Sequence, residues 1–282
     1  MNRFFLVCVV VAFLFQGCKQ NSSAENEGAM ENADSINVVD NDPTEDETDE
    51  LISEEPMPQA AEELFDDFFF NFASNKRLQK ERISFPLLVH SHARTDTLRR
   101  EDWHTDHFFM HQEEFTSIFD NEEQVNRMKD TTLDEVVVEK IFLNQGFVHQ
   151  YMFRKKKGLW MLDEIHKQTL SLNPNSSFLS FYRRFVSDSA FQQQSLNEEI
   201  QFVGPDPDDE FSQMEGVITP DFWGAFAPEL PHDTIYNIVY GKRKPSSDER
   251  IFVIRGISNG QEVELTVHRQ HDIWKLTKLA ER

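Results

Sequence analysis

The chain has 282 residues, of which 39% are hydrophobic and 12% aromatic, with 26 phenylalanines, and this much apolar surface excludes a wholly disordered protein. The net charge of -22 repels phosphate backbones, so no nucleic-acid partner is expected. Both cysteines, Cys8 and Cys18, lie at the amino terminus. The rest of the chain therefore has no disulfide, thiolate nucleophile or cysteine-bound zinc.

The first eighteen residues have the pattern of a secretory signal. Arg3 precedes an apolar run, Phe4 to Phe15, that is shorter than the about twenty residues needed to span a bilayer, so we predict a signal peptide over residues 1–17. The ending Phe15-Gln16-Gly17-Cys18 resembles the relaxed lipobox of bacterial lipoproteins, particularly those of Bacteroidetes. The resemblance implies that Cys18 carries the lipid and that this anchor holds the protein at a membrane of the bacterial cell envelope. Whether it faces the periplasm or the cell surface stays open.

Residues 18–60 are predicted to form a disordered acidic linker after the lipidated cysteine. This segment has 13 acidic residues against the single basic residue Lys19, and it contains three prolines and no aromatic residue. Such a composition cannot bury enough apolar surface to offset the entropy of ordering, and its like charges extend it. A solvated stalk is favoured over a specific acidic binding tail. Residues 61–282, with 37 acidic and 26 basic residues, are predicted to be globular.

The globular part contains two copies of one pattern. Three phenylalanines at spacings of three and four, which place them on one helical face, recur 113 positions later. They are Phe65, Phe68 and Phe72 in the first copy and Phe178, Phe181 and Phe185 in the second. A last strand bearing Trp160 recurs 114 positions later with Trp274. Between these, Trp103 to Phe108 can be laid over Ile218 to Trp223 at a shift of 115. The nearly equal shifts indicate a duplicated module.

The predicted elements follow the same order in both copies. Each copy opens with an amphipathic helix, a short helix and a strand, continues with a helix capped by Asp106 or Asp221, and ends in antiparallel hairpins. In the first copy the opening helix spans about 61–75 and the strands span 85–90, 133–143, 147–153 and 159–166. In the second copy the helix spans 176–188 and the strands span 200–203, 235–240, 250–257, 262–268 and 273–279. The order predicts an α+β fold with two domains, 61–170 and 174–282.

This order, with a long first helix and a final tryptophan-bearing strand, resembles the cystatin-like cone fold of the nuclear transport factor 2 superfamily, in tandem. It also resembles an uncharacterised group of Bacteroidetes lipoproteins built from such repeats. The resemblance implies that in each domain N-terminal helices pack on a curled antiparallel sheet, which leaves a pocket at the open end. Some members of the superfamily are isomerases or dehydratases and many only bind, so the fold does not decide the function.

Five of the ten histidines fall within 22 residues: His90, His92, His104, His107 and His111. On a helix, the spacings of three and four among the last three would place three imidazoles on one face, as in a zinc or nickel site. A helix capped by Asp106 would leave His104 outside it, and the second copy has no histidine at the aligned positions. We therefore expect no metal centre and no cofactor. The candidate ligands to be tested by metal titration are His104, His107 and His111.

A general acid–base site could be formed by acidic residues of the predicted strands together with the four tyrosines. They are Glu135, Glu139, Asp163, Glu164 and Glu264, with Tyr151, Tyr182, Tyr236 and Tyr240. Strand alternation predicts that most of these acids face solvent, Glu139 among them, so no catalytic residue is assigned. The basic run Arg154 to Gly158 is interpreted as a hairpin tip rather than as a site for an anionic partner. The sequence contains no nucleophile elbow, phosphate-binding glycine loop or dinucleotide fingerprint.

The sequence favours a membrane-anchored module that binds and performs no chemistry of its own. We expect the pocket of a cone, or a groove between the two copies, to take a small apolar or saccharide ligand or an envelope protein. An isomerase-like or dehydratase-like enzyme is the first alternative, and it requires an inward-facing acid within about 3 Å of a tyrosine or histidine. A structural or assembly role is the second alternative, and it predicts filled cones. The ligand and the oligomeric state do not follow from the sequence.

Overall fold

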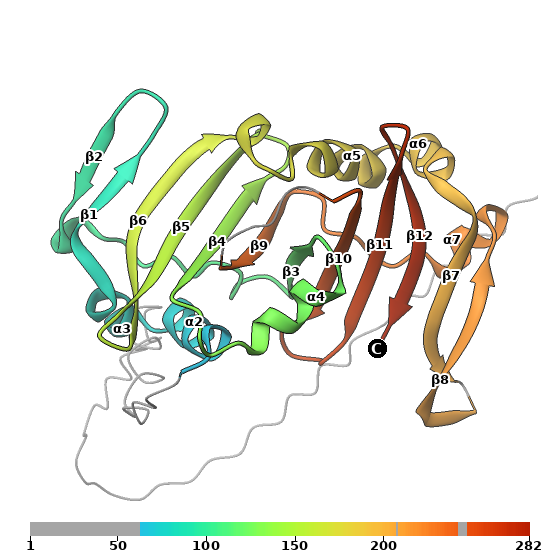
Figure 1. The fold of residues 1–282 in the computed structure, drawn as a ribbon, viewed down its shortest axis with the longest axis horizontal. Coiled ribbons are helices and arrows are strands. Elements are labelled where there is room, and N and C mark those ends of the chain that lie inside the picture. Colours follow the sequence, from blue (N-terminus) through green and yellow to red (C-terminus); the bar gives the residue numbers. More distant parts are fainter. Residues whose placement is uncertain (1–62, 207, 242–246) are drawn as a thin grey trace, which may run out of the picture. The chain divides into compact units, whose positions relative to one another are not determined.

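The computed structural model describes residues 63–206, 208–241 and 247–282 (Figure 1). All of them belong to one compact unit, Glu45–Arg282, which we call the described unit. The predicted signal peptide over 1–17, the lipid-bearing Cys18 and the acidic linker to residue 60 lie outside the described residues. None of the described helices combines the length and the apolar character that crossing a membrane requires.

A similar series of elements occurs twice in the described unit: two helices, two strands, a short 3₁₀ helix and four further strands, with additional short helices that differ between the halves. The first half comprises α2 (Phe65–Ser74), α3 (Lys76–Glu81), β1 (Ile83–His90), β2 (Thr95–Leu98), η1 (Arg100–Asp102), β3 (Glu114–Phe119), α4 (Glu122–Val125), η2 (Asn126–Lys129), β4 (Glu135–Phe142), β5 (Phe147–Lys156) and β6 (Leu159–Thr169). The second half comprises η3 (Leu170–Leu172), α5 (Ser176–Ser187), α6 (Ser189–Gln194), β7 (Leu196–Asp206), β8 (Asp209–Ile218), η4 (Pro220–Phe222), α7 (Trp223–Phe226), β9 (Thr234–Tyr240), β10 (Glu249–Gly256), β11 (Glu262–Gln270) and β12 (Ile273–Glu281). The mixed α+β class is confirmed, whereas β2, β3 and β8 were absent from the predicted elements.

The phenylalanine-rich helices pack as the repeat predicts. Side chains of Phe68 and Phe72 on α2 are fully buried, and the Phe65 ring lies edge-on to Trp160 of β6 with ring centroids 5.0 Å apart. On α5, the Phe178 ring has the same relation to Trp274 of β12 at 6.0 Å. Each fully buried phenylalanine contributes about 1.5–3 kcal/mol relative to an exposed one, so the two helical faces stabilise the two cores directly.

A glutamine ties the helices of each half to a tryptophan that follows the first two strands, and Gln79 of the first half is fully buried. Gln79 donates through Nε2 to the Phe72 carbonyl at 2.9 Å, and its Oε1 accepts from Trp103 Nε1 at 3.0 Å. In the second half, Gln192 Oε1 accepts from Trp223 Nε1 at 3.2 Å in the same way. The equivalent of Trp103 is therefore Trp223, and the predicted overlay of Trp103 on Ile218 is wrong. The longer β7–β8 hairpin shifts the numbering at this point.

No helix begins at Asp106 or Asp221, contrary to the sequence prediction. Residues 107–112 form turns, and Phe108 has a positive φ of 49°, a conformation that interrupts a helix. The Asp106 carboxylate accepts from the Phe108 backbone N–H at 2.9 Å, which closes a turn rather than capping a helix. In the second half, Asp221 lies inside η4, and α7 begins after it at Trp223.

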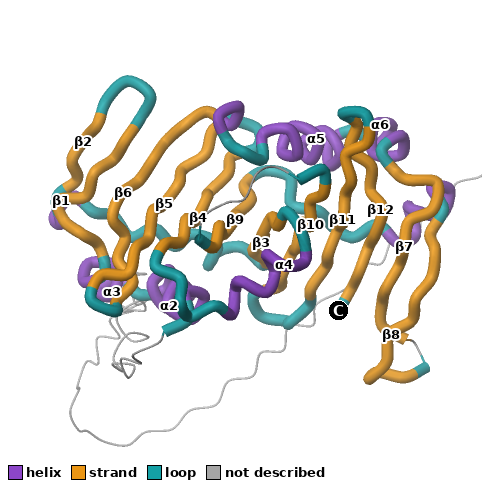
Figure 2. Tube along the Cα trace, viewed as in Figure 1, coloured by secondary structure: helices purple, strands orange, loops and turns teal. Residues whose placement is uncertain are grey.

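The two halves exchange strands. Two self-contained copies would pair β3 with β4 and β9 with β10, yet β9 pairs with β4 over seven residue pairs and β3 pairs with β10 over six. The sheets are therefore β2-β1-β6-β5-β4-β9 and β3-β10-β11-β12-β7-β8, which we call sheet A and sheet B. Figure 2 shows β9 beside β4 and β3 beside β10. The second series of elements follows β6, which ends at Thr169, and each sheet contains one strand from the other half.

The exchange brings a buried polar network to the middle of sheet A. Glu139 on β4 is 1% exposed, so the prediction that it faces solvent is wrong, because the second half covers this face of β4. Its carboxylate accepts from the side-chain amides of Gln150 at 2.8 Å, Asn173 at 2.7 Å and Asn237 at 2.6 Å. Asn237 Oδ1 in turn accepts from the Ile118 backbone N–H of β3 at 2.8 Å. One carboxylate thus connects strands of both halves.

Removing the Glu139 carboxylate should destabilise the described unit strongly. In a Glu139→Ala chain, the buried amides of Asn173 and Asn237 and the half-buried amide of Gln150 would lose their acceptor, and we expect a loss of about 3 kcal/mol or more in the free energy of unfolding. Urea denaturation measures this loss. The matched control is Glu135→Ala on the same strand, whose side chain is 37% exposed, and it should cost less than about 1 kcal/mol. Equal losses in the two variants would contradict the network's role.

Candidate functional site

Aromatic rings fill the interior of both sheets' curls. In the first half, the Phe69 ring centroid lies 4.9 Å from that of Phe108 and 5.6 Å from that of Phe153, and all three side chains are buried. In the second half, the Tyr182 ring lies 4.5 Å from the Phe252 ring. Side chains thus occupy the space in which the resemblance implied a pocket, so candidate sites have to be sought at the mouths of the curls and on the outer faces of the sheets.

The mouth of the first curl carries the polar residues Asp106, Lys140, His149, Tyr151 and Tyr236, which we call the mouth cluster. Asp106 Oδ2 accepts from the Tyr151 hydroxyl at 2.6 Å, and its Oδ1 lies 3.2 Å from Lys140 Nζ. Lys140 Nζ also lies 6.0 Å from the centroid of the Tyr236 ring, within the range of a cation–π interaction. His149 is placed here by strand register, since it pairs with Lys140 on β4 and Lys167 on β6.

Burial and charge set the protonation of the mouth cluster. Burial, reinforced by the Asp106 carboxylate, raises the pKa of Tyr151 well above its ordinary value, so the phenol stays protonated and donates. Burial also raises the pKa of Tyr236. Burial, with a smaller contribution from Lys167 and Lys140, lowers the pKa of His149 from 6.5 to about 4, so this imidazole is neutral at neutral pH. The cluster therefore combines a carboxylate, an ammonium group, two phenols and a neutral imidazole.

Four residues of the mouth cluster belong to the first half, and Tyr236 comes from β9 of the second half. The strand registers match Lys140, His149 and Tyr151 with Ile254, Val263 and Leu265 of the second half, which are apolar. The cone architecture therefore does not need these polar groups. Asp106 entered the sequence analysis as a helix cap and Lys140 not at all, because only the tertiary structure brings the 106 loop against β4 and β5.

The other predicted acids and tyrosines are engaged in separate contacts. Glu139 lies in the buried network, and Glu264 pairs with Lys278 at 3.3 Å. Asp163 pairs with Lys156 and with Arg154. Remaining contacts join Glu135 to Arg154 at 4.0 Å, Tyr182 to the Pro231 carbonyl at 2.8 Å and Tyr240 to Asp66 at 2.6 Å. Among the residues described, an acid and a tyrosine therefore meet in two places, at Asp106–Tyr151 and at Asp66–Tyr240. The Arg154 to Gly158 run covers the end of β5 and the turn to β6, as the hairpin interpretation predicts.

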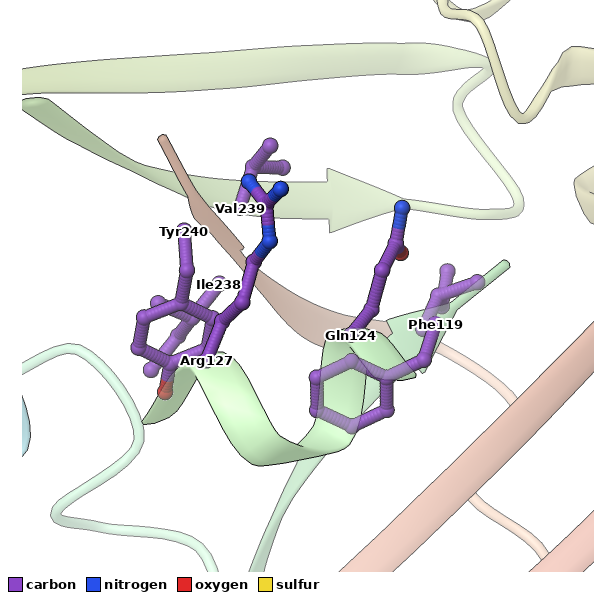
Figure 3. Close-up of a pocket in the computed structure, with 7 residues that line it drawn as sticks. Phe119, Gln124, Arg127, Ile238, Val239 and Tyr240 are labelled. Carbon is purple, nitrogen blue, oxygen red and sulfur yellow. The ribbon is translucent and has the colours of Figure 1, made fainter. Parts of the chain in front are cut away.

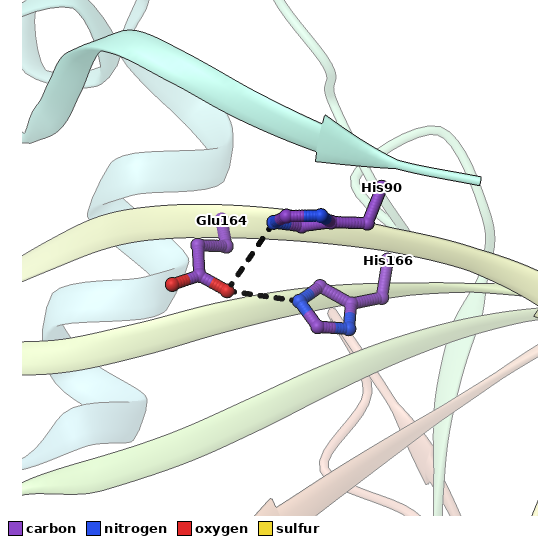
Figure 4. A group of neighbouring side chains, drawn as sticks. All are labelled: His90, Glu164 and His166. Atoms are coloured by element: carbon purple, nitrogen blue, oxygen red, sulfur yellow. Dashed lines mark hydrogen bonds and ion pairs between the residues drawn. The ribbon is translucent and has the colours of Figure 1, made fainter. Parts of the chain in front are cut away.

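The three histidine candidates for a metal do not come together. The rings of His107 and His111 lie 4.6 Å apart in the loop, whereas His104 is exposed before it. The reason is the missing helix, since turns do not hold the spacing of three and four on one face. Among the residues that the structure describes, three candidate ligands converge at His90, Glu164 and His166 instead (Figure 4). Parallel pairing of β1 with β6, which the sequence analysis did not foresee, produces this group.

A small cavity lies where β3 and β9 pass each other (Figure 3). Gln124 and Arg127, from α4 and η2, face Phe119 of β3 and Tyr240 of β9 across it. Its volume of about 20 Å³ is enough for about one water molecule. This cavity is too small for a metabolite, and it marks a local gap where the exchanged strands meet.

A larger groove lies on the face of sheet B that points away from the second core. Its volume is about 540 Å³, within the range of ligand-binding clefts. The floor is formed by side chains of β10, β11 and β12, including Ile251, Thr266 and Thr277, and one wall is the start of α4. At the floor, His268 Nε2 lies 3.2 Å from a Glu249 carboxylate oxygen. The lining is rich in hydroxyl, amide and charged groups, which suits a polar ligand better than an apolar one.

The lowered pKa of His149 predicts a pH-dependent stability. Because the folded pKa of about 4 lies below the ordinary 6.5, the unfolded chain binds the proton first, and stability is lost as the pH falls from about 6.5 towards 4. A His149→Gln chain should lose less stability over this range. Urea denaturation at pH 7.5 and at pH 4.5 measures the difference. His92→Gln, at an exposed bend, serves as the control and should behave like the parent chain. Identical pH dependence in all three chains would contradict the assignment.

Comparisons with known proteins identify a similar structure and a family. None of the curated proteins is significantly similar to the chain. The crystal structure of a nuclear transport factor 2-like protein from Bacteroides fragilis is similar to it, with a TM-score of 0.73 and 37% sequence identity over 80% of this chain and 99% of that one. Residues 44–281 match the model of a family described as a domain of unknown function, DUF4348. The chain therefore belongs to the DUF4348 family.

Proposed function

We propose that this chain is a lipid-anchored protein of the bacterial cell envelope whose described unit binds a polar ligand, such as a saccharide, or an envelope protein, in the groove on sheet B. The observation that carries the proposal is the groove itself, with its volume of about 540 Å³ and its polar lining. Hydroxyl and amide groups of Thr266, Thr277 and Gln201 and the charges of Glu249 and Lys278 offer both donors and acceptors. A ligand rich in hydroxyl groups can form hydrogen bonds with these donors and acceptors. An apolar ligand would remove water from them without replacing the lost hydrogen bonds.

The anchor follows from the amino terminus. An apolar run too short to span a bilayer, followed by the lipobox-like Phe15-Gln16-Gly17-Cys18, supports lipid attachment at Cys18. The acidic segment to residue 60 would then act as the tether between the lipid and the described unit. A tether of like charges keeps the binding unit away from an anionic membrane surface.

The two halves are proposed to descend from one duplicated cone domain. The same element order, the equivalent glutamine–tryptophan hydrogen bonds and the irregularities at matching places in the last hairpins support this origin. In the β5–β6 pair the register shifts between Met152 and Phe153, and in the β11–β12 pair it shifts between Thr266 and Val267, 114 positions later. Duplication with strand exchange accounts for both the repeat and the single unit.

An enzyme is the second candidate function, and the mouth cluster favours it. The contact of 2.6 Å between Asp106 and Tyr151 meets the distance that an acid–base pair requires. Its groups, however, already satisfy one another: Asp106 accepts from Tyr151 and Phe108 and pairs with Lys140, while Tyr151 is 4% exposed. Three donors therefore already share the Asp106 carboxylate, and Asp106 lines neither the small cavity nor the groove described above. Binding in the groove therefore remains the function that the geometry supports best.

Lipid anchoring predicts the behaviour of a Cys18→Ala chain. Without the thiol there is no attachment point, so the variant should leave the membrane fraction, while the parent chain stays in it because several acyl chains bury many methylene groups. Fractionation of cells followed by immunoblotting measures the distribution. Cys8→Ala, inside the predicted signal peptide, is the control and should stay with the membrane. Retention of the Cys18→Ala chain in the membrane fraction would refute the anchor.

Ligand binding in the groove predicts a selective loss in a filled variant. Thermal-shift screening of the parent chain against a glycan and metabolite library should reveal a ligand that raises the melting temperature, because it binds the folded state alone. A Gln201→Trp change on β7 would fill the groove and abolish that rise. The matched control is Leu88→Trp, at the equivalent position on sheet A, which should keep it. An equal response of both variants would place the ligand elsewhere.

A further inference from the structure

The register of two neighbouring strands places two imidazoles and one carboxylate on the same face of sheet A. His90 of β1 pairs with His166 of β6 in a parallel arrangement, and Glu164 lies two residues before His166 on that face. The Glu164 oxygen Oε2 lies 2.9 Å from His166 Nε2 and 3.6 Å from His90 Nε2. Figure 4 shows both rings directed at this one oxygen from adjacent strands.

Neighbouring side chains orient His90 Nε2 and Glu164 Oε2 toward each other. His90 Nδ1 lies 3.0 Å from Thr95 Oγ1 of β2, so a tautomer with the proton on Nδ1 leaves the Nε2 lone pair facing Glu164. Arg154 contacts the other carboxylate oxygen, Oε1, at 3.3 Å, which leaves Oε2 to the two histidines. Hydrogen bonds of this kind, from the second ring N–H of a histidine to an oxygen and from a cation to a carboxylate, are the usual supports of metal ligands.

The fold does not require this group of three. The equivalent register on sheet B pairs Val203 of β7 with Ala280 of β12, and the position equivalent to Glu164 is Lys278. The equivalent strands β7 and β12 therefore pair in the second half with no histidine at these positions. Side chains of His90 and Glu164 are 34% and 28% exposed, so an ion and a water molecule can reach them from solvent.

We infer that His90, Glu164 and His166 form a binding site for a divalent transition metal of the zinc class. Two ligand atoms about 2.0–2.1 Å from a tetrahedral zinc ion lie about 3.3–3.4 Å from each other, and the two nitrogen–oxygen distances of 3.6 Å and 2.9 Å lie on either side of this value. The metal replaces the hydrogen bond between His166 and Glu164, and water supplies the fourth ligand. Imidazole nitrogen selects zinc, nickel, cobalt or copper over magnesium and calcium.

The site is independent of the proposed groove. It lies on sheet A, whereas the groove lies on sheet B, and no residue is common to both. The ion would join β1, which follows the opening helices, to β6, the last strand of the first half. Metal binding would therefore stabilise the folded unit whether or not the groove takes a ligand.

Titration of Zn²⁺ into the full chain by isothermal calorimetry tests the inference. We expect binding of one equivalent in the parent chain, and an affinity at least about tenfold weaker in Glu164→Gln and in His166→Ala. A Thr95→Val chain should keep the stoichiometry but bind about tenfold more weakly, because it loses the hydrogen bond that orients His90. Every variant keeps both cysteines, so any heat from the thiols is common to all of them.

The matched control is His107→Ala, in the other histidine pair, which should bind as the parent chain does. A melting experiment adds a second readout: Zn²⁺ should raise the melting temperature of the parent chain and of His107→Ala, and not that of His166→Ala. Similar melting temperatures of all chains without metal would show that the variants are folded. Absence of binding in the parent chain, or undiminished binding by His166→Ala, overturns the site.

Discussion

The exchange of β3 and β9 between the halves is the constraint on which the rest of the structure depends. Each strand completes a sheet that belongs mainly to the other half, so Tyr236 and Ile238 of β9 fill the first core and Ile118 of β3 fills the second. The strands also bring Asn237 to the carboxylate of Glu139. A buried carboxylate is costly unless its oxygens are hydrogen-bonded, and the three amide donors around Glu139 meet that need only when both halves are in place. Neither half can therefore be separated without exposing a core and leaving a charge unpaired.

The two halves keep the same supports and differ in their chemistry. The glutamine–tryptophan bonds, the caps formed by Asn75 and Asp188, and the ring contacts under the last strand occur in both. These features hold helices against a curled sheet, so either half needs them. The first half alone has Lys140, His149 and Tyr151 of the mouth cluster and the group of His90, Glu164 and His166, and apolar residues or a lysine stand at the equivalent positions of the second. Because the two halves have a similar fold, they can be compared with each other. A polar residue that is present in one half and absent from the equivalent position of the other is not required for folding.

The candidate sites could be predicted only in part. The histidine-rich stretch and Glu164 stood out in the sequence, but the spacing argument selected His104, His107 and His111 because it assumed a helix. Turns around Phe108 break that spacing, while the parallel pairing of β1 with β6 creates a different group from residues about 75 positions apart. The groove was out of reach for a similar reason, because its floor and wall come from α4 and from four strands of the other half.

The sequence by itself determined the short-range features: the amphipathic helices with their phenylalanine faces, the hairpins of the last three strands in each half, and the order of elements that led to the cone fold. These follow from periodicity and turn residues, which act within a few positions along the chain. Only the tertiary structure decided which strands pair across the halves, that Glu139 is buried, and that His90 meets His166. A strand can pair with more than one sheet edge, and the pairing that forms is the one that buries both cores. It therefore depends on the whole unit and not on any local segment.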